Sequence, residues 1–350
     1  SGCERLVEVY NLSELTLDLD YLGLNALYGH SSSPYCVVHT DPSEQSIIKT
    51  TPDGYSFIAL TKNEITGSVT NYYLLDYSGN AENLVLPASY DGNDYKIFDY
   101  AFACNSKVKS IGLSAQVTAI GSDILYGSDN VTAITVDGGN SVYTASNNCL
   151  ISKADKKFVL GCKTSVIPAD GSVTTIGSNV FCHNKTVTGE SFRIPDSVTV
   201  VESGAFIGCD GLIRTAANGV RYVDKWAIEF YYGGASNEVD GVDLVLDEGT
   251  VGVSNGAFGT NTEISAKRKI KSVVTGGELK YIGASAFYNC SALETVTLND
   301  GLLSIGDSAF GSCTKLKEII VPDSAETVGA SAFMRCSAMT YVKLSSSLSV

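Results

Sequence analysis

Ten cysteines are the residues of this 350-residue chain with the most evident chemical potential. Thiols in this number can form disulfides, hold a metal ion or act as nucleophiles. Three of them, Cys290, Cys313 and Cys336, recur at intervals of 23 residues, each three residues after a phenylalanine. Three equivalent neighbours cannot all pair, and free cysteine behaves as a small buried hydrophobic side chain. The spacing therefore predicts buried thiols within a repeat.

Two other groupings could form disulfide or metal sites. Cys149 and Cys162 flank a predicted pair of strands, so they form either a cross-strand disulfide or two free thiols. His30, Cys36 and His39 cluster near the N-terminus. A zinc site needs four ligands, and no fourth is evident there. We therefore expect no metal site and no cofactor.

The sequence has none of the common catalytic motifs. It contains no Gly-x-Ser-x-Gly elbow, no phosphate-binding loop and no His-Glu-x-x-His pair. Its 3 histidines all lie outside the regular repeats described below, which argues against a histidine-based triad. We expect no enzymatic activity and assign no catalytic residue.

Charge and hydropathy exclude further classes of partner. The net charge is −14, and residues 1–100 hold 14 Asp and Glu against 4 Lys and Arg. Nucleic acids are recognised by basic surfaces, so a nucleic-acid partner is not expected. No apolar run reaches the ~18 residues that a membrane span requires, so we expect no membrane-spanning segment.

A 23-residue repeat positions Cys290, Cys313 and Cys336. The segments that begin at Tyr281, Ser304 and Thr327 align throughout, including an Ile/Val-Gly step, an Ala-Phe pair and the cysteines. Each copy holds a short alternating strand, a turn in which glycine is expected to take a positive φ, and a helical turn that Asp307 or Ser308 can cap. Such a unit cannot close a core alone, so copies must stack, with equivalent side chains about 4.8 Å apart. The predicted fold is a solenoid with a parallel β-sheet on one side and short helical turns on the other.

The period is interrupted twice, and each interruption carries a two-strand pattern. We interpret these segments as β-hairpins inserted near 141–163 and 218–240, which we expect to protrude from the repeats. The predicted domains are an irregular N-terminal region over 1–79, which begins within a partial repeat, and a repeat domain over 80–350. The last strand is not followed by a polar capping repeat, so we expect a segment of a longer protein.

The string Ile-Gly-x-x-Ala-Phe-x-x-Cys-x-x-Leu-x-x-Val-x-Leu-Pro, carried with minor variation by residues 305–322, resembles the BspA-like leucine-rich repeat family. That resemblance implies a secreted or cell-surface protein of mucosal bacteria or parasites, with adhesion to host matrix proteins or other cells as the role. A structural spacer or a carbohydrate-recognition module within a larger surface protein is the alternative.

A ligand surface is expected on the exposed face of the predicted strands. There, side chains that flank the buried strand residues point away from the core. The candidate ligand-binding residues are Thr295, Thr297, Glu318, Ile320, Tyr341 and Lys343. Ile320 and Tyr341 are apolar where solubility alone would favour polar residues, which hints at a contact patch. We expect a monomer that binds a protein ligand, with host matrix proteins among the candidates.

Overall fold

The structure is a computed structural model, and the chain falls into two compact units, Ser1–Ala145 and Ser146–Val350. The structure describes residues 8–10, 37–39, 41, 43, 46–64, 67–189, 191–230, 241–259 and 270–348. Cys3, Leu6, His30 and Cys36, on which the partial first repeat and the zinc question depend, lie outside these residues. The predicted division between residues 79 and 80 stays a prediction.

The first unit contains one mixed sheet and two parallel sheets. β3 (Lys49–Thr50), β4 (Tyr55–Glu64) and β5 (Gly67–Tyr77) are antiparallel neighbours, and β7 (Lys96–Ile97) joins β5 in parallel. The remaining strands form two parallel groups: β1 (Glu8–Tyr10) with β2 (Val37–His39), and β6 (Asn83–Val85) with β8 (Ser110–Leu113) and β9 (Ala133–Val136). β10 (Tyr143–Ser146) spans the end of this unit.

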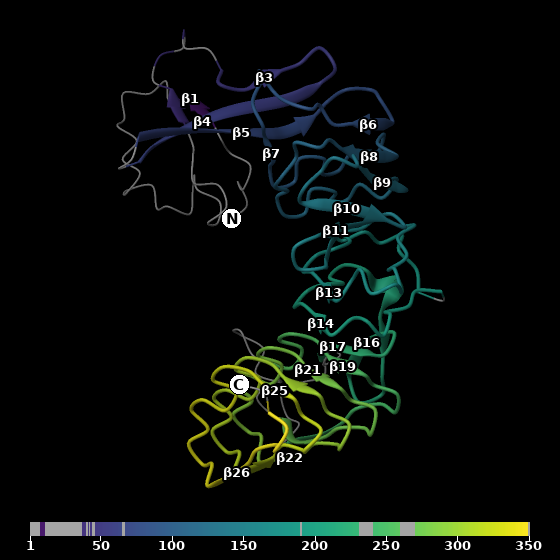
Figure 1. The fold of residues 1–350 in the computed structure, drawn as a ribbon, viewed down its shortest axis with the longest axis vertical. Coiled ribbons are helices and arrows are strands. Elements are labelled where there is room, and N and C mark those ends of the chain that lie inside the picture. The colour runs from purple at the N-terminus through teal and green to yellow at the C-terminus, as the bar shows by residue number, and fades with distance from the viewer. Residues whose placement is uncertain are drawn as a thin grey trace. The chain divides into compact units, whose positions relative to one another are not determined.

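The second unit is a solenoid whose rungs each contribute strands to stacked parallel sheets (Figure 1). One stack is built from β18 (Val242–Val245), β20 (Ile270–Val274) and β22 (Thr295–Thr297), which β24 (Glu318–Ile320) and β26 (Tyr341–Lys343) continue. A second stack consists of β19 (Gly252–Val253), β21 (Tyr281–Ile282), β23 (Ser304–Ile305) and β25 (Thr327–Val328). Earlier rungs supply β13 (Thr175–Ile176) and β14 (Val200–Val201).

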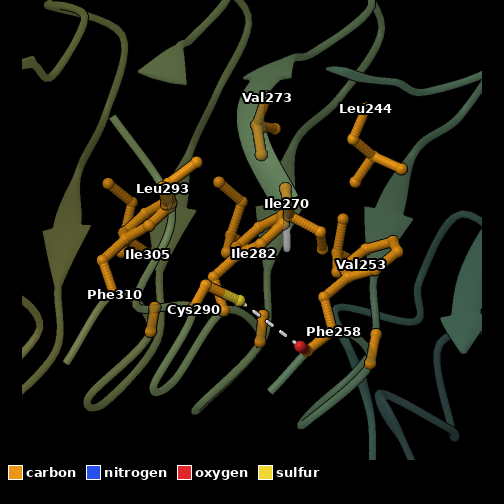
Figure 2. Close-up of a cluster of buried hydrophobic side chains, with 14 of the residues drawn as sticks. Leu244, Val253, Phe258, Ile270, Val273, Ile282, Cys290, Leu293, Ile305 and Phe310 are labelled. Atoms are coloured by element: carbon orange, nitrogen blue, oxygen red, sulfur yellow. Dashed lines mark hydrogen bonds between the residues drawn. The ribbon is translucent and has the colours of Figure 1, made fainter. Parts of the chain in front are cut away.

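Equivalent side chains stack from rung to rung, as the 23-residue spacing predicts. The ring centroids of Phe258 and Phe287 lie 5.0 Å apart, those of Phe287 and Phe310 5.2 Å, and those of Phe310 and Phe333 6.0 Å. Their planes differ by at most 14°. The rings lie in one elongated core with Ile282 and other aliphatic side chains of both sheets (Figure 2). The solenoid fold is therefore confirmed.

The three repeat cysteines are buried in this core and carry free thiols. Each Sγ donates a weak hydrogen bond to a phenylalanine carbonyl of the preceding rung: Cys290 to Phe258 at 3.4 Å (Figure 2), Cys313 to Phe287 at 3.2 Å and Cys336 to Phe310 at 3.1 Å. Cys149 and Cys162 are also free and buried. The three repeat thiols thus link successive rungs by hydrogen bonds and not by covalent bonds.

The predicted helical turn of the repeat is a run of tight turns instead. Ala309 N donates to Gly306 O and Cys313 N to Phe310 O, which are bonds to the third preceding residue. Ser308 and Ser312 take φ values of 53° and 61°, and left-handed residues at these points prevent a helix from propagating. Their amides donate to the next rung instead, from Ser308 N to Ala330 O and from Ser312 N to Met334 O. Among the described residues the sole helix is the 3₁₀ turn η1 (Asp210–Leu212).

The glycine of the Ile-Gly step has a different role from the predicted one. Gly283, Gly306 and Gly329 do not have positive φ. A Cβ on Gly306 would instead lie 2.4 Å from Ala284 N, and one on Gly329 would lie 2.4 Å from Asp307 N. Glycine is required here because the backbone of the preceding rung passes too closely for any side chain.

The predicted capping role of Asp307 is also wrong. Its Oδ1 accepts a hydrogen bond from Ala330 N of the next rung at 2.7 Å, and so it does not cap a turn of its own rung. Asn255 makes the same contact to Ala284 N at 2.8 Å. The side chain at this position links successive rungs.

Two antiparallel hairpins interrupt the repeats, as predicted. The first pairs β11 (Cys149–Ser152) with β12 (Lys157–Leu160). The second pairs β16 (Val220–Val223) with β17 (Trp226–Phe230), next to β15 (Arg214–Thr215). The expectation that they protrude is wrong, because β12 pairs in parallel with β13 and β17 with β19. Each hairpin supplies a strand of the solenoid.

Candidate interaction surface

The six candidate residues lie on three successive strands, and all six are exposed. Strand alternation places Val296 and Ile319 toward the core, so the residues on either side of them face solvent. The register pairs Glu318 with Tyr341 and Ile320 with Lys343. The candidates therefore form two columns that run across the strands.

Both columns continue onto β20 and β18. Ser272 pairs with Thr295 and with Asp243, and Val274 pairs with Thr297 and with Val245. We call the first set the polar column: Asp243, Ser272, Thr295, Glu318 and Tyr341. We call the second set the β-branched column: Val245, Val274, Thr297 and Ile320.

The β-branched column places apolar area in solvent. Val245, Val274 and Ile320 are 54%, 41% and 53% exposed, whereas Ile319 beside Ile320 is 1% exposed. A stack of branched side chains suits a parallel sheet. Exposed apolar area is unfavourable in water, however, so covering this column with a partner would be favourable. Aligned exposed residues of this kind mark contact surfaces more often than scattered ones do.

A hollow of about 610 Å³ lies beside this column, where β22 and β24 adjoin. These two strands belong to separate hydrogen-bonded sheets. Four candidates take part in it, namely Thr297, Glu318, Ile320 and Lys343. The remaining lining residues are Val296, Leu298, Asp300, Ile319, Pro322, Asp323 and Ser324.

Carboxylates outnumber cations in the hollow. Asp300, Glu318 and Asp323 face one ammonium group, that of Lys343, whose Nζ lies 3.7 Å from Asp323 Oδ2. A hydrogen bond from the Ser346 amide, followed by the charge of Lys343, lowers the pKa of the Asp323 carboxyl. Because carboxylates carry a negative charge near neutral pH, the hollow favours a positively charged group.

A second hollow, of about 250 Å³, has its charges paired internally. Arg221 lies 3.0 Å from Glu229 and 3.6 Å from Asp210. Glu202 on the same wall lies 2.7 Å from Lys157. Because these groups already have partners, the larger hollow is the better candidate for a ligand.

Other chemistry receives little support from the described residues. Among them, no group of three His, Cys, Asp or Glu side chains is arranged to hold a metal ion. None of the helices in the described residues is long and apolar enough to cross a bilayer. Trp226, the only tryptophan of the chain, is 2% exposed and stacks on Tyr281 with centroids 6.1 Å apart. It therefore cannot act as a platform for a sugar ring.

Sequence reasoning missed the extension of both columns and the two aspartates of the hollow. One signal was available, because a step of 23 residues back from Thr295 and Thr297 leads to Ser272 and Val274. No such step leads to β18, since 29 residues separate Val245 from Val274. Asp300 and Asp323 follow their strands as turn residues, and their sequence context alone does not bring them to one hollow.

The repeat is that of a known family. The model of the BspA type leucine-rich repeat region matches in 6 copies, over residues 68–213, 155–231 and 261–350. The chain belongs to the BspA-type leucine-rich repeat family. Comparison with curated protein sequences gave no match.

Several solved structures are similar to this chain. A leucine-rich cell surface protein of Faecalibacterium prausnitzii is 19% identical, with 86% of this chain and 95% of that chain covered and a TM-score of 0.30. The pneumococcal vaccine antigen PcpA is 16% identical, with 86% of each chain covered and a TM-score of 0.35. A leucine-rich repeat protein of Bacteroides ovatus is 19% identical, with 86% and 90% covered and a TM-score of 0.33.

Proposed function

We propose that this chain is a non-catalytic binding segment of a secreted or cell-surface protein, and that it adheres to a protein of host matrix or of other cells. The contact surface is the face formed by the polar and β-branched columns. We further propose that the segment acts as a monomer, without a cofactor and without nucleic acid as a partner.

The observation that carries the proposal is the alignment of Val245, Val274 and Ile320 in solvent across successive rungs. The solenoid needs only the inward residues of these strands for its own core. The outward column contributes apolar contact area without contributing to that core. Tyr341, at 51% exposure, adds an aromatic side chain of the kind that is enriched at interfaces.

The test is a binding screen of the purified chain against immobilised host matrix proteins and a glycan array. For each ligand found, we expect Ile320→Asp and Tyr341→Ala to weaken binding, because both remove apolar contact area. The matched control is Ile207→Asp, since Ile207 is an exposed aliphatic residue (49%) of the same unit away from these columns.

Four outcomes would contradict the proposal. Protein binding that is unchanged in both sheet-face variants would show that this face is not the contact surface. Equal loss in Ile207→Asp would indicate a general effect of added charge. Binding to glycans without any protein ligand would favour the carbohydrate-recognition alternative, and absence of every ligand would favour the structural spacer.

A further inference from the structure

We propose that the β-branched column docks an amphipathic α-helix of the partner, with basic side chains on the flank of that helix that covers the hollow. This inference rests on the proposed function, because it names the kind of partner that the same face accepts. It follows from the spacing of the column and from the distribution of charge beside it.

Spacing favours a helix that lies across the strands. Neighbouring strands are about 4.8 Å apart, so the column offers one branched side chain about every 4.8 Å. One face of an α-helix advances about 5.4 Å per turn. One face of an extended chain advances about 6.7 Å, which is two residues of strand. The mismatch per rung is therefore about 0.6 Å for a helix and about 1.9 Å for a strand.

Accumulated mismatch decides between the two. From Val245 to Ile320 the column makes three steps. Over that distance the side chains of a strand would be displaced from the column residues by more than one strand spacing, so they would not match the column one to one. A helix would slip by about 2 Å, which side-chain rotamers can absorb. About ten helical residues cover this length.

The charges beside the column determine which flank of the helix is basic. Asp300 and Asp323 line the hollow beyond the carboxyl ends of the strands, on one side of the column, with Lys343 as the cation there. On the far edge, at the beginning of the strands, the exposed carboxylates of Asp243 and Glu318 are accompanied by the exposed cations Lys271 and Lys317. Carboxylates therefore exceed cations on the side of the hollow, whereas the exposed charges balance on the far edge. Lysine or arginine on the corresponding flank of the helix would be attracted, and acidic residues would be repelled.

The experiment uses three fluorescent peptides of about 15 residues and the whole chain. The first is a stable helix with leucines on one stripe and arginines on one flank. The second replaces those arginines with glutamates. The third has the composition of the first, with leucines at alternate positions so that it favours a strand. We expect the first to bind at least about tenfold more tightly than the other two.

Variants of the chain locate the site. Val274→Asp should weaken binding of the first peptide about tenfold or more, and Ile207→Asp should leave it unchanged. The double change Asp300→Asn and Asp323→Asn should reduce both the affinity and its dependence on salt. Circular dichroism and Trp226 fluorescence check that each variant is folded.

The inference is overturned if the alternating or acidic peptide binds as well as the basic helix, or if no peptide binds. Either result leaves the proposed function standing, provided that a protein ligand still loses binding in Ile320→Asp. If that ligand is indifferent to Ile320→Asp, the proposed function itself fails.

Discussion

The close approach of successive rungs at the Ile-Gly step can be tested by adding one methyl group. In Gly306→Ala the new Cβ would lie 2.4 Å from Ala284 N, 2.6 Å from Gly283 C and 2.8 Å from Ala284 Cα. Ordinary contact begins at 3.4 Å, so β23 and β21 must separate by about 1 Å. All three obstructing atoms belong to the backbone, and no rotamer change can relieve the contact.

Two opposing contributions set the size of the effect. Overpacking of this kind costs about 1–3 kcal/mol, and more where backbone must move. Replacement of glycine by alanine also restricts the unfolded chain, which returns about 0.4–1 kcal/mol. We expect Gly306→Ala to lower the free energy of unfolding by about 2 kcal/mol, equivalent to a fall in Tm of about 4–8 °C for a unit of this size.

Urea denaturation followed by Trp226 fluorescence measures this quantity in the correct part of the molecule. The indole stacks on Tyr281 of β21, which is the direct neighbour of β23. Gly277→Ala is the matched control, since a Cβ at Gly277 would meet no atom within 4 Å and this glycine has no positive φ. This control should be neutral or slightly stabilising.

A second pair of variants separates close approach from backbone conformation. Gly204 has a φ of 72° with its nearest atom at 3.5 Å, so Gly204→Asn should be tolerated better than Gly204→Ala. At Gly306, asparagine should be no better than alanine, because both carry a Cβ. The close-approach argument is refuted if the free energy of unfolding of Gly306→Ala lies within about 0.5 kcal/mol of that of the original chain. It is also refuted if asparagine at this position restores stability.

Four further outcomes are expected. Cys313→Ser should lower the free energy of unfolding by about 1–3 kcal/mol, measured in urea, because it places a hydroxyl in an apolar site; no loss would contradict that placement. A thiol reagent should label the exposed Cys104 before any other described cysteine, since burial raises the pKa of the Cys313 thiol; rapid labelling of Cys313 in the native chain would oppose this. Burial raises the pKa of the Cys149 thiol from 9.0 to about 12, so the folded state keeps a proton that the unfolded state releases. Stability should therefore fall by up to about 1.4 kcal/mol per pH unit between pH 9 and 12, and less steeply in Cys149→Ala. Gly252→Ala should shift Trp226 emission to longer wavelength, because the new Cβ would lie 2.5 Å from the indole ring; an unchanged spectrum would show that the ring has room.

The stacked core was readable from the sequence because it depends on equivalence between copies. Once Phe287, Phe310 and Phe333 are aligned at 23-residue steps, stacking is the one arrangement that buries all of them. The outward residues of β22, β24 and β26 followed from the same alignment and from strand alternation. The exposure of the candidate residues was therefore predictable, although their role in binding stays a proposal.

The second stack of strands was not predictable from local pattern. β21, β23 and β25 each have two residues, which is too short to show any alternation. Their pairing is set by the neighbouring rung, which also explains the turns. A serine at φ near 55°, such as Ser308, has no local signature in the sequence. It is stabilised because its amide finds a carbonyl of the next rung.

The hairpins show the same dependence on neighbours. Alternation in Phe158-Val159-Leu160 predicts a strand correctly, but gives no information about what lies beside it. Failure of the repeat period at this point suggests a strand that protrudes. Instead β12 occupies the place of a rung strand and presents Phe158 to Ile176 of β13, so the fold tolerates a change of period while the stack continues.

The smaller hollow lies where two rungs lack the glycine of the repeat. Glu202 and Ser254 occupy the position that is glycine in the regular rungs, directly after Val201 and Val253. Both residues line this hollow, where the second hairpin separates one rung from the next along the sequence. Both residues still make the backbone hydrogen bond to the preceding rung that the glycines make, from Glu202 N to Ile176 O and from Ser254 N to Ala227 O, each at 2.9 Å. The change from glycine therefore adds a side chain to the wall of the hollow while the rungs stay hydrogen-bonded, and Arg221 with its carboxylate partners lies on the same wall.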